Sequence, residues 1–324
     1  MTPTLILTFL TSTIRVATTL LFGSTGEIIT EKSGHLNLGI PGIMCIGAAC
    51  GCLGESLYTK SLNYNYALMN PALAVLIPLL CAILGSALMG LIYSFLTVTL
   101  RANQNVTGLT LTTFGVGVTN YIIGRLDAIS FQRGSGYFTT PLPFAKNLGW
   151  FGQIFLSYGF LVYVGIIIAV IASLVLTKTR VGLHLRSVGE NPATADAMGI
   201  NVTAYRYSAT CIGSAIAGMG GLFFVMDYLG GNWEYCIDAM GWLSIALVIF
   251  TVWKPHMSIL GSFLFGGLYI VYNYIDGITF AQKELLKMLP YVVTIIVLVA
   301  TSIRNKRESQ PPAGLGLNYY REER

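Results

Sequence analysis

The polar side chains whose spacing suits chemistry are amides and hydroxyls inside an otherwise apolar segment. Thr113, then Val116 or Gly117, and then Asn120 are each about one helical turn apart, so one face of a helix would carry them. Such a face can line a cavity for a hydroxylated solute. The same side chains could instead form hydrogen bonds between helices, which is the commoner use of polar residues in lipid. The pattern indicates either a solute pathway or a helix interface.

Enzyme chemistry finds little support in the sequence. His35, His184 and His256 are isolated, and the zincin, nucleophile-elbow and phosphate-loop motifs are missing. The six cysteines have no histidine or second cysteine pair at metal spacing, which favours packing thiols. We therefore predict a chain that is not itself catalytic and binds no metal or cofactor. Any ATP and Mg²⁺ would be bound by another polypeptide.

A polar insert between Arg180 and Gly199 has the signals of one short, capped helix. Asn191 suits the N-cap, Pro192 suits the first helical position, and Gly199 suits the left-handed residue that closes a helix. At ~1.5 Å per residue the helix would be only about 10 Å long, far too short to cross a bilayer. A membrane protein that keeps such a helix between two spans presents it to the aqueous phase.

Composition places the chain in the membrane. The 324 residues are 54% hydrophobic and only 10% charged, whereas a soluble domain has about 25% charged residues. The mean hydropathy is +0.68. Most of the 36 glycines lie inside apolar segments, where they favour close helix contacts in lipid. We predict an all-α integral membrane protein, and we interpret the net charge of +5 as topology rather than as a nucleic-acid site.

The apolar stretches predict a polytopic bundle of about nine transmembrane helices, with eight to ten as the range. They lie near residues 4–24, 38–57, 67–99, 105–124, 154–177, 204–229, 239–253, 257–275 and 285–303. The third is long enough to cross twice, but no polar turn divides it. In the second, Gly39, Pro41 and Gly42 predict an interrupted helix.

The basic residues predict which side faces the cytoplasm. A cytoplasmic C-terminus puts twelve of the nineteen lysines and arginines inside and six outside, and Arg15 falls within the first span. The short helix at 190–199 then also faces the cytoplasm. We expect a membrane domain over residues 1–303 and a disordered cytoplasmic tail over 304–324.

Several polar residues leave alternatives open. Asn37 either satisfies backbone groups at a tight re-entry or lines a polar pathway, and Asn103 or Asn105 is expected to cap the fourth helix. Arg15 is expected to form a structural ion pair, with Glu27 as a possible partner, or else to contact solute. All fourteen acidic residues are placed in loops or at span ends, which argues against an ion-coupled secondary transporter.

Four segments together resemble bacterial ABC importer permeases of the nucleoside and branched-chain amino-acid type. They are Glu27–Met44, Leu100–Leu109, Val188–Ile200 and Ala246–Pro255, and the resemblance extends over roughly residues 12–300. The Asn-Gln-x-Val-Thr-Gly and Gly-Glu-Asn-Pro blocks are most similar to those of purine-nucleoside permeases.

The resemblance implies that residues 190–199 are a coupling helix, which docks on a cytoplasmic ATP-binding subunit. The coupling residues would be Glu190, Asn191, Pro192, Ala195, Asp196 and Gly199. It also implies a second permease subunit, identical or paralogous, and an extracytoplasmic solute-binding lipoprotein or protein. The chain would form half of a pore in the bacterial cytoplasmic membrane, with Asn37, Asn105, Thr113 and Asn120 as candidate pathway residues.

One position departs from the family pattern. Nucleoside permeases of this group usually carry Glu where this chain has Pro41, and the proline is expected to kink the pore-side helix. Nucleosides are the expected solutes, with riboflavin or a sugar as alternatives within the same importer type. An ion-coupled secondary transporter is the alternative from a different class.

Overall fold

The computed structural model describes residues 3–141, 149–235, 237–275, 277–304 and 310–320. The described residues form helices and connecting turns, with no strand among them. The helices are α1 (Pro3–Glu31), α2 (Ile40–Ser61), η1 (Tyr66–Leu68), α3 (Pro71–Ser94), η2 (Phe95–Thr99), α4 (Gln104–Ile123), α5 (Ala128–Phe138), α6 (Gly149–Phe155), α7 (Phe160–Lys178), α8 (Arg180–Glu190), α9 (Pro192–Ala197), α10 (Val202–Phe223), η4 (Phe224–Tyr228), α11 (Ile237–Phe250), α12 (Pro255–Ile270), η5 (Val271–Tyr274), α13 (Phe280–Lys287) and α14 (Leu289–Arg304).

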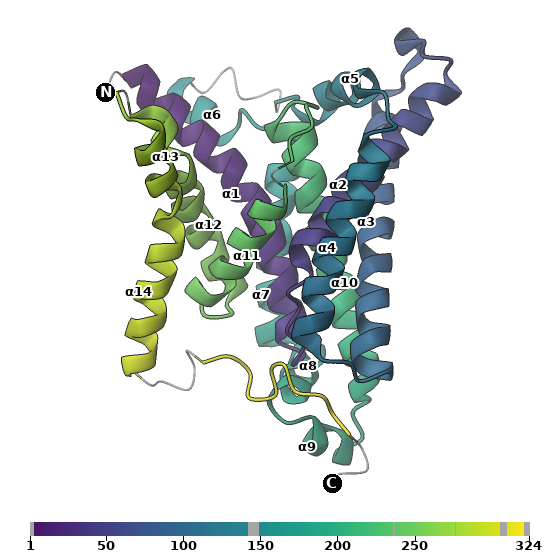
Figure 1. The fold of residues 1–324 in the computed structure, drawn as a ribbon, viewed down its shortest axis with the longest axis vertical. Coiled ribbons are helices and arrows are strands. Elements are labelled where there is room, and N and C mark those ends of the chain that lie inside the picture. Colours follow the sequence, from purple (N-terminus) through teal and green to yellow (C-terminus); the bar gives the residue numbers. More distant parts are fainter. Residues whose placement is uncertain (1–2, 142–148, 236, 276, 305–309, 321–324) are drawn as a thin grey trace.

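The long helices run up and down between two ends of the molecule (Figure 1). The start of α1 and the short helices α5, α6 and α13 lie at the upper end. The short helices α8 and α9 and residues 310–320 lie at the lower end. The start of α1 and the tail are thus at opposite ends, as an odd number of crossings requires.

Seven helices of the described chain are long and apolar enough to cross a membrane. The predicted third stretch is a single span, because α3 continues through the π-helical turn η2 to Thr99. The expected count of nine is not confirmed. The helices α11, with 14 residues, and α14, with 16, rise only about 21–24 Å at ~1.5 Å per residue, against a hydrocarbon core of about 30 Å.

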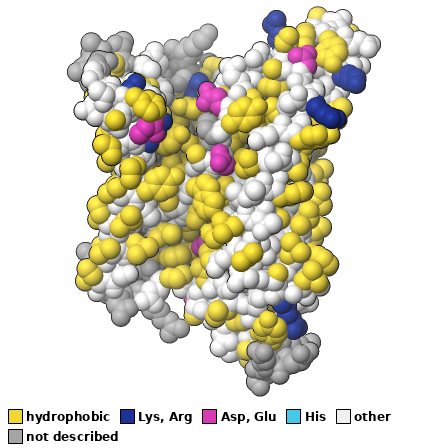
Figure 2. Space-filling view, viewed as in Figure 1, with side chains coloured by type: hydrophobic (Ala, Val, Ile, Leu, Met, Phe, Trp, Pro, Cys, Tyr) yellow, Lys and Arg dark blue, Asp and Glu magenta, His cyan; other side chains and the backbone are white. Residues whose placement is uncertain are grey.

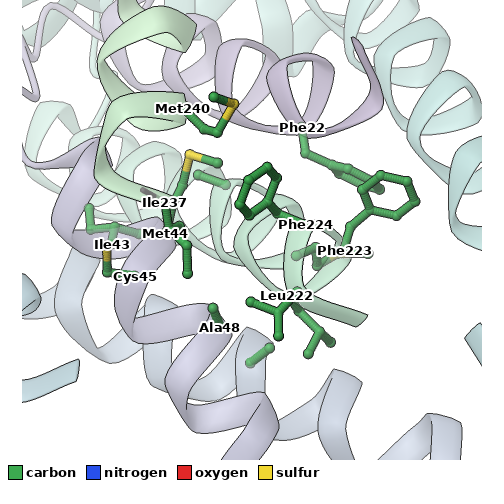
Figure 3. Close-up of a cluster of buried hydrophobic side chains, with 14 of the residues drawn as sticks. Phe22, Ile43, Met44, Cys45, Ala48, Leu222, Phe223, Phe224, Ile237 and Met240 are labelled. Atoms are coloured by element: carbon green, nitrogen blue, oxygen red, sulfur yellow. The ribbon is translucent and has the colours of Figure 1, made fainter. Parts of the chain in front are cut away.

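The core lies where α1, α2, α10 and α11 meet. Figure 3 shows Phe22 of α1 beside Phe223 of α10, and Met44 of α2 near Met240 of α11, with the ring of Phe224 between the two pairs. The helices α2 and α10 are the most buried spans, whereas α3, α4, α7 and α12 expose much of their surface. The central pair is therefore held by side-chain packing from the outer helices.

The predicted interruption of the second span is wrong. The helix α2 begins at Ile40 and runs unbroken to Ser61, with Pro41 in its first turn. A proline there removes an N–H that has no partner within the helix, so it starts the helix without kinking it. Gly42 serves a different purpose, because a Cβ at this position would lie 2.6 Å from the Cα of Thr112 on α4.

The packing of α4 on α2 predicts that substitutions at two glycines of α4 will affect stability differently. A methyl group at Gly115 would lie 2.6 Å from the carbonyl oxygen of Gly42, whereas one at Gly117 would meet nothing within 4 Å. Gly115→Ala is expected to destabilise the chain by about 1–3 kcal/mol through overpacking. Gly117→Ala should be neutral or gain up to about 1 kcal/mol from helix propensity. Thermal unfolding of the purified variants in detergent measures both, and equal melting temperatures would contradict the contact.

The tail differs from the expected disorder after residue 304. The last helix ends at Arg304, and residues 310–320 follow the lower end of the bundle beneath α8 (Figure 1). Their backbone is hydrogen bonded to that end, because Gly314 N donates to Gly189 O over 2.9 Å and Gly316 N donates to Gly34 O over 3.1 Å. The polar composition of this segment predicted disorder. It could not reveal these contacts, because they are main-chain hydrogen bonds, which do not require apolar side chains.

Candidate translocation face and coupling surface

One side of α4 exposes small and polar residues along the length of a candidate span, beside exposed apolar residues such as Phe114 and Tyr121. Thr110, Thr113, Gly117 and Asn120 are all exposed and follow one another at helical spacing, and we call this set the α4 polar face. The exposed row of α3 is different, because it consists of leucines such as Leu80, Leu84 and Leu88. Lipid suits the leucine row, whereas amide and hydroxyl groups are costly against hydrocarbon.

The hydroxyls of the α4 polar face are oriented by their own helix. Thr110 Oγ1 donates to Val106 O over 2.8 Å, and Thr113 Oγ1 donates to Leu109 O over 3.2 Å. Each oxygen keeps acceptor capacity for a group outside the helix. Apolar side chains cover the middle of the molecular face that includes α4, and most Lys and Arg side chains on it lie toward its two ends (Figure 2).

The opposite side of α4 is anchored to the loop that leads into α2. Thr112 Oγ1 donates to Leu38 O over 2.8 Å, and the buried side chain of Gln104 accepts a hydrogen bond from Leu36 N over 2.9 Å. A Cβ at Gly108 would lie 2.8 Å from Leu38 N. These contacts fix which side of the helix turns outward.

The four predicted pathway residues do not lie together. Thr113 and Asn120 are on the α4 polar face, and Asn105 is exposed in the first turn of α4, where Asn103 makes the N-cap bond to Val106 N. Asn37 is fully buried, and its Oδ1 accepts a hydrogen bond from Gly39 N over 2.9 Å. Its contacts match the backbone-satisfying alternative. Contact of the four residues with solute stays a prediction.

Buried polar groups surround the loop between α1 and α2. Glu27 Oε1 accepts a hydrogen bond from Asn37 N over 3.1 Å, and Glu31 accepts one from the indole N–H of Trp253. The Tyr93 hydroxyl donates to Leu36 O over 2.6 Å. The loop at the lower end of α1 is therefore tied to α3 and to the turn after α11. Sequence reasoning missed Trp253 and Tyr93, because each lies far along the chain from its partner.

Two carboxylates contradict the placement of all acidic residues in loops or at span ends, because Glu27 and Glu55 lie within candidate spans. Glu31 and Asp227 do lie at span ends, but all four side chains are at most 3% exposed. Arg15 has an ion-pair partner as expected, but the partner is Asp227, with Arg15 Nε 3.7 Å from Asp227 Oδ1. Glu27 contacts Asn37 instead. The acidic residues thus no longer separate an ATP-driven permease from an ion-coupled transporter.

His35, in the loop after α1, gives a pH prediction. Burial lowers the pKa of His35 well below its ordinary value, and the positive charge of Arg206 lowers this pKa further. The folded state holds the ring neutral beside Thr210, with His35 Nδ1 3.2 Å from Oγ1. The unfolded chain protonates the ring below about pH 6.5, so stability is lost as the pH falls through that value. Thermal unfolding from about pH 7.5 to about pH 5.5 should show a smaller loss for His35→Gln than for the unaltered chain.

The predicted short helix is present as α9, Pro192–Ala197. The Asn191 side chain accepts from Thr194 N over 3.0 Å, Pro192 lies in the first turn, and Gly199 has a φ of +82°. With α8, the short helix projects at the lower end of the bundle (Figure 1). All three capping signals in the sequence were therefore correct.

The outward side of α9 differs from the one expected. Ala195 is only 2% exposed and packs between Val188 of α8 and Val202 of α10. Thr194, Ala197 and Met198 are exposed, as are Asn191 and Gly199 at the two ends of the helix, and the Met198 side chain is 77% exposed. We call Thr194, Ala197 and Met198 the α9 outer face. Ala195 anchors the helix, and the available docking surface lies on its other side.

Two of the predicted coupling residues, Glu190 and Asp196, contact the tail. Glu190 Oε2 accepts from Ala313 N over 3.3 Å, and Asp196 Oδ2 accepts from the Tyr319 hydroxyl over 2.8 Å. These partners were not predicted, because the tail was expected to be disordered.

Comparison with known proteins identifies relatives over most of the chain. Residues 9–298 match the family described as branched-chain amino acid transport system / permease component. The nucleoside ABC transporter permease protein NupC of Lactococcus lactis subsp. cremoris (strain MG1363) is 35% identical over 289 residues, which are 87% of this chain and 88% of the relative. The guanosine ABC transporter permease protein NupQ of Bacillus subtilis (strain 168) is 29% identical and covers 89% of each chain.

Two further matches have lower sequence identity. The putative glucose ABC transporter permease protein TsgC13 of Haloferax volcanii (strain ATCC 29605) is 28% identical over 335 residues, which are 97% of each chain. A solved structure described as an inward-facing conformation of a putative metal-chelate type ABC transporter aligns with a TM-score of 0.48 and 11% identity. The alignment covers 88% of this chain and 85% of that one.

Proposed function

Because the chain belongs to the family of permease components of branched-chain amino acid transport systems, and is a multi-pass permease component of an ABC transporter, we propose that it forms half of a pore that imports nucleosides. The other half would be a second permease subunit, identical or paralogous. ATP and Mg²⁺ would be bound by cytoplasmic subunits, and an extracytoplasmic lipoprotein or protein would deliver the solute. The assembly would lie in the bacterial cytoplasmic membrane.

The α4 polar face is the observation that carries the half-pore. A single chain that encloses its own pathway would keep such residues inside, but Thr113 and Asn120 are on its surface. A second permease subunit that covers this face would turn them toward a shared pathway. Hydroxyl and amide groups then meet the hydroxyls of a ribose and the polar edge of a base.

The names of the relatives support nucleosides first. NupC and NupQ are described as nucleoside and guanosine permeases, whereas TsgC13 is described as a putative glucose permease. A sugar is therefore the second candidate, since the same hydroxyl-bearing face suits both. Pro41, where nucleoside permeases usually carry Glu, is buried in the first turn of α2 against Gly241.

The α9 outer face supports coupling to a separate ATPase. The exposed Met198 offers an apolar anchor at the lower end of the bundle, of the kind that dominates protein interfaces. The basic-residue count that puts the C-terminus inside also puts α9 in the cytoplasm.

Transport in proteoliposomes tests the proposal. The chain would be reconstituted with its partner permease, ATP-binding subunits and solute-binding protein, and uptake of labelled guanosine would be measured with and without ATP. We expect uptake that requires ATP and survives an ionophore. Uptake that needs an ion gradient instead would establish a secondary transporter. ATP-driven uptake of glucose or riboflavin without guanosine would overturn the nucleoside assignment alone.

A further inference from the structure

Residues 310–320 form what we call the C-terminal strap, which first contacts the α8–α9 segment. Gly314 N donates to Gly189 O over 2.9 Å, and the Tyr319 hydroxyl donates to Asp196 Oδ2 over 2.8 Å. The Tyr319 side chain also packs against the cluster that seats α9, formed by Val188, Ala195 and Val202. The strap therefore holds α9 by a polar and an apolar contact.

The same strap contacts the start of α4. Asn318 Nδ2 donates to Arg101 O over 2.6 Å, and Gln104 Nε2 donates to Leu317 O over 3.4 Å. The Arg101 guanidinium lies over the ring of Tyr320, 4.7 Å from its centroid. Gln104 is the buried residue that also fixes the loop before α2.

Two more segments of the lower end meet the strap. Gly316 N donates to Gly34 O over 3.1 Å in the loop between α1 and α2, and Arg206 Nη2 of α10 donates to Leu317 O over 3.4 Å. Leu315 packs against the apolar cluster that includes Ile28 and Leu185. The segment is thus bonded to the connections between several spans.

Between α9 and the start of α4 lies a cavity of about 380 Å³. Asp196 and Asn201 line it from the α9 side, Thr97 and Arg101 line it from the α3–α4 side, and Tyr319 of the strap lines it as well. The helix α9 itself packs mainly on α8 and α10. A displacement of α9 toward or away from α4 would change this cavity, and the strap is bonded to both sides of it.

We propose that the C-terminal strap transmits movement of α9 to α4. The proposal rests on the proposed function, because it takes α9 as the element that an ATPase displaces. When α9 moves, the strap moves with it because Tyr319 is bonded to Asp196. The first turn of α4 then moves with the strap, through the bonds of Asn318 and of Leu317 O. The α4 polar face is then reoriented in step with ATP hydrolysis, and hydrolysis without the strap continues with little transport.

Truncation and a single-atom variant test the strap in the full transporter. Removal of residues 310–324 is expected to lower the solute imported per ATP hydrolysed by at least about fivefold, with ATPase binding retained. Tyr319→Phe, which removes only the hydroxyl bonded to Asp196, should lower the same ratio by roughly twofold or more. A control should keep the original ratio: removal of residues 321–324 leaves all of residues 310–320 in place.

A structural measurement tests the strap proposal independently of which solute the transporter carries. Hydrogen exchange at α9 and at the first turn of α4 would be compared between nucleotide-free and vanadate-trapped complexes, with no solute added. In the full chain both segments should change, and after truncation or in Tyr319→Phe only α9 should change. A change at α4 that persists without the strap overturns the proposal. Failure of guanosine uptake with this exchange pattern intact would remove the nucleoside assignment and leave the strap standing.

Discussion

Gly117→Trp is expected to abolish transport while the chain itself still folds. A Cβ at Gly117 would meet nothing within 4 Å, and the position is exposed, so the indole can extend away from the separate subunit. In the assembled pore the same indole would fill the space between subunits on the α4 polar face. Uptake per transporter should fall by roughly a hundredfold or more, since a misplaced group of this size blocks either assembly or passage.

A tryptophan on α3 is the matched control. Leu88 is 56% exposed in the leucine row, where lipid can accommodate a larger apolar ring. Leu88→Trp is expected to keep more than about half of the original uptake, with the same expression and melting temperature. Normal uptake by Gly117→Trp, or equal losses in the two variants, would show that the α4 polar face is not a shared surface.

Met198→Glu is expected to weaken binding of the ATP-binding subunit by roughly tenfold to a hundredfold. The change places a charge where an exposed apolar side chain is available as an anchor, and interface anchors contribute about 1–3 kcal/mol or more. Binding of the purified ATP-binding subunit to the permease in nanodiscs gives the dissociation constant, and ATPase stimulation in the complex should fall in parallel.

The control for Met198 is an exposed leucine at the other end of the bundle. Leu68 in η1 is 65% exposed, and Leu68→Glu should bind the ATP-binding subunit as the unaltered chain does. Ala195→Trp is a less informative variant, because Ala195 is buried and a larger side chain would displace α9 itself. Tight binding by Met198→Glu would remove the α9 outer face as the docking surface.

The sequence predicted where the helices lie along the chain better than which side of each helix is buried and which residues it contacts. Apolar stretches separated by polar turns located the seven helices long enough to cross a membrane, although they predicted nine spans. Asn191, Pro192 and Gly199 located α9, because these signals act within a few residues. The direction that Ala195 faces was not predictable, since it depends on Val202 of α10 closing over it. Which carboxylate meets Arg15 was equally out of reach, because Asp227 is joined to it only by the packing of the whole bundle.

Some residues of the candidate site were predicted from the sequence and others were not. Helical spacing placed Thr113 and Asn120 on one side of α4, and the structure exposes that side. Asn37 was a true alternative, because an amide at a glycine-rich turn serves the backbone as readily as a solute. The role of Gln104 could have been suspected from the sequence. It lies in the Asn-Gln-x-Val-Thr-Gly block that resembles the permease family, where a glutamine can bond to another segment as well as start a helix.

The position of the strap has a practical consequence for handling this protein. Tyr320 rests on Arg101, so a purification tag or fluorescent fusion joined shortly after this residue begins next to the bonded segment. The same addition before α1 would project from the opposite end of the bundle. A tag at that position leaves the strap and α9 at the lower end unaltered.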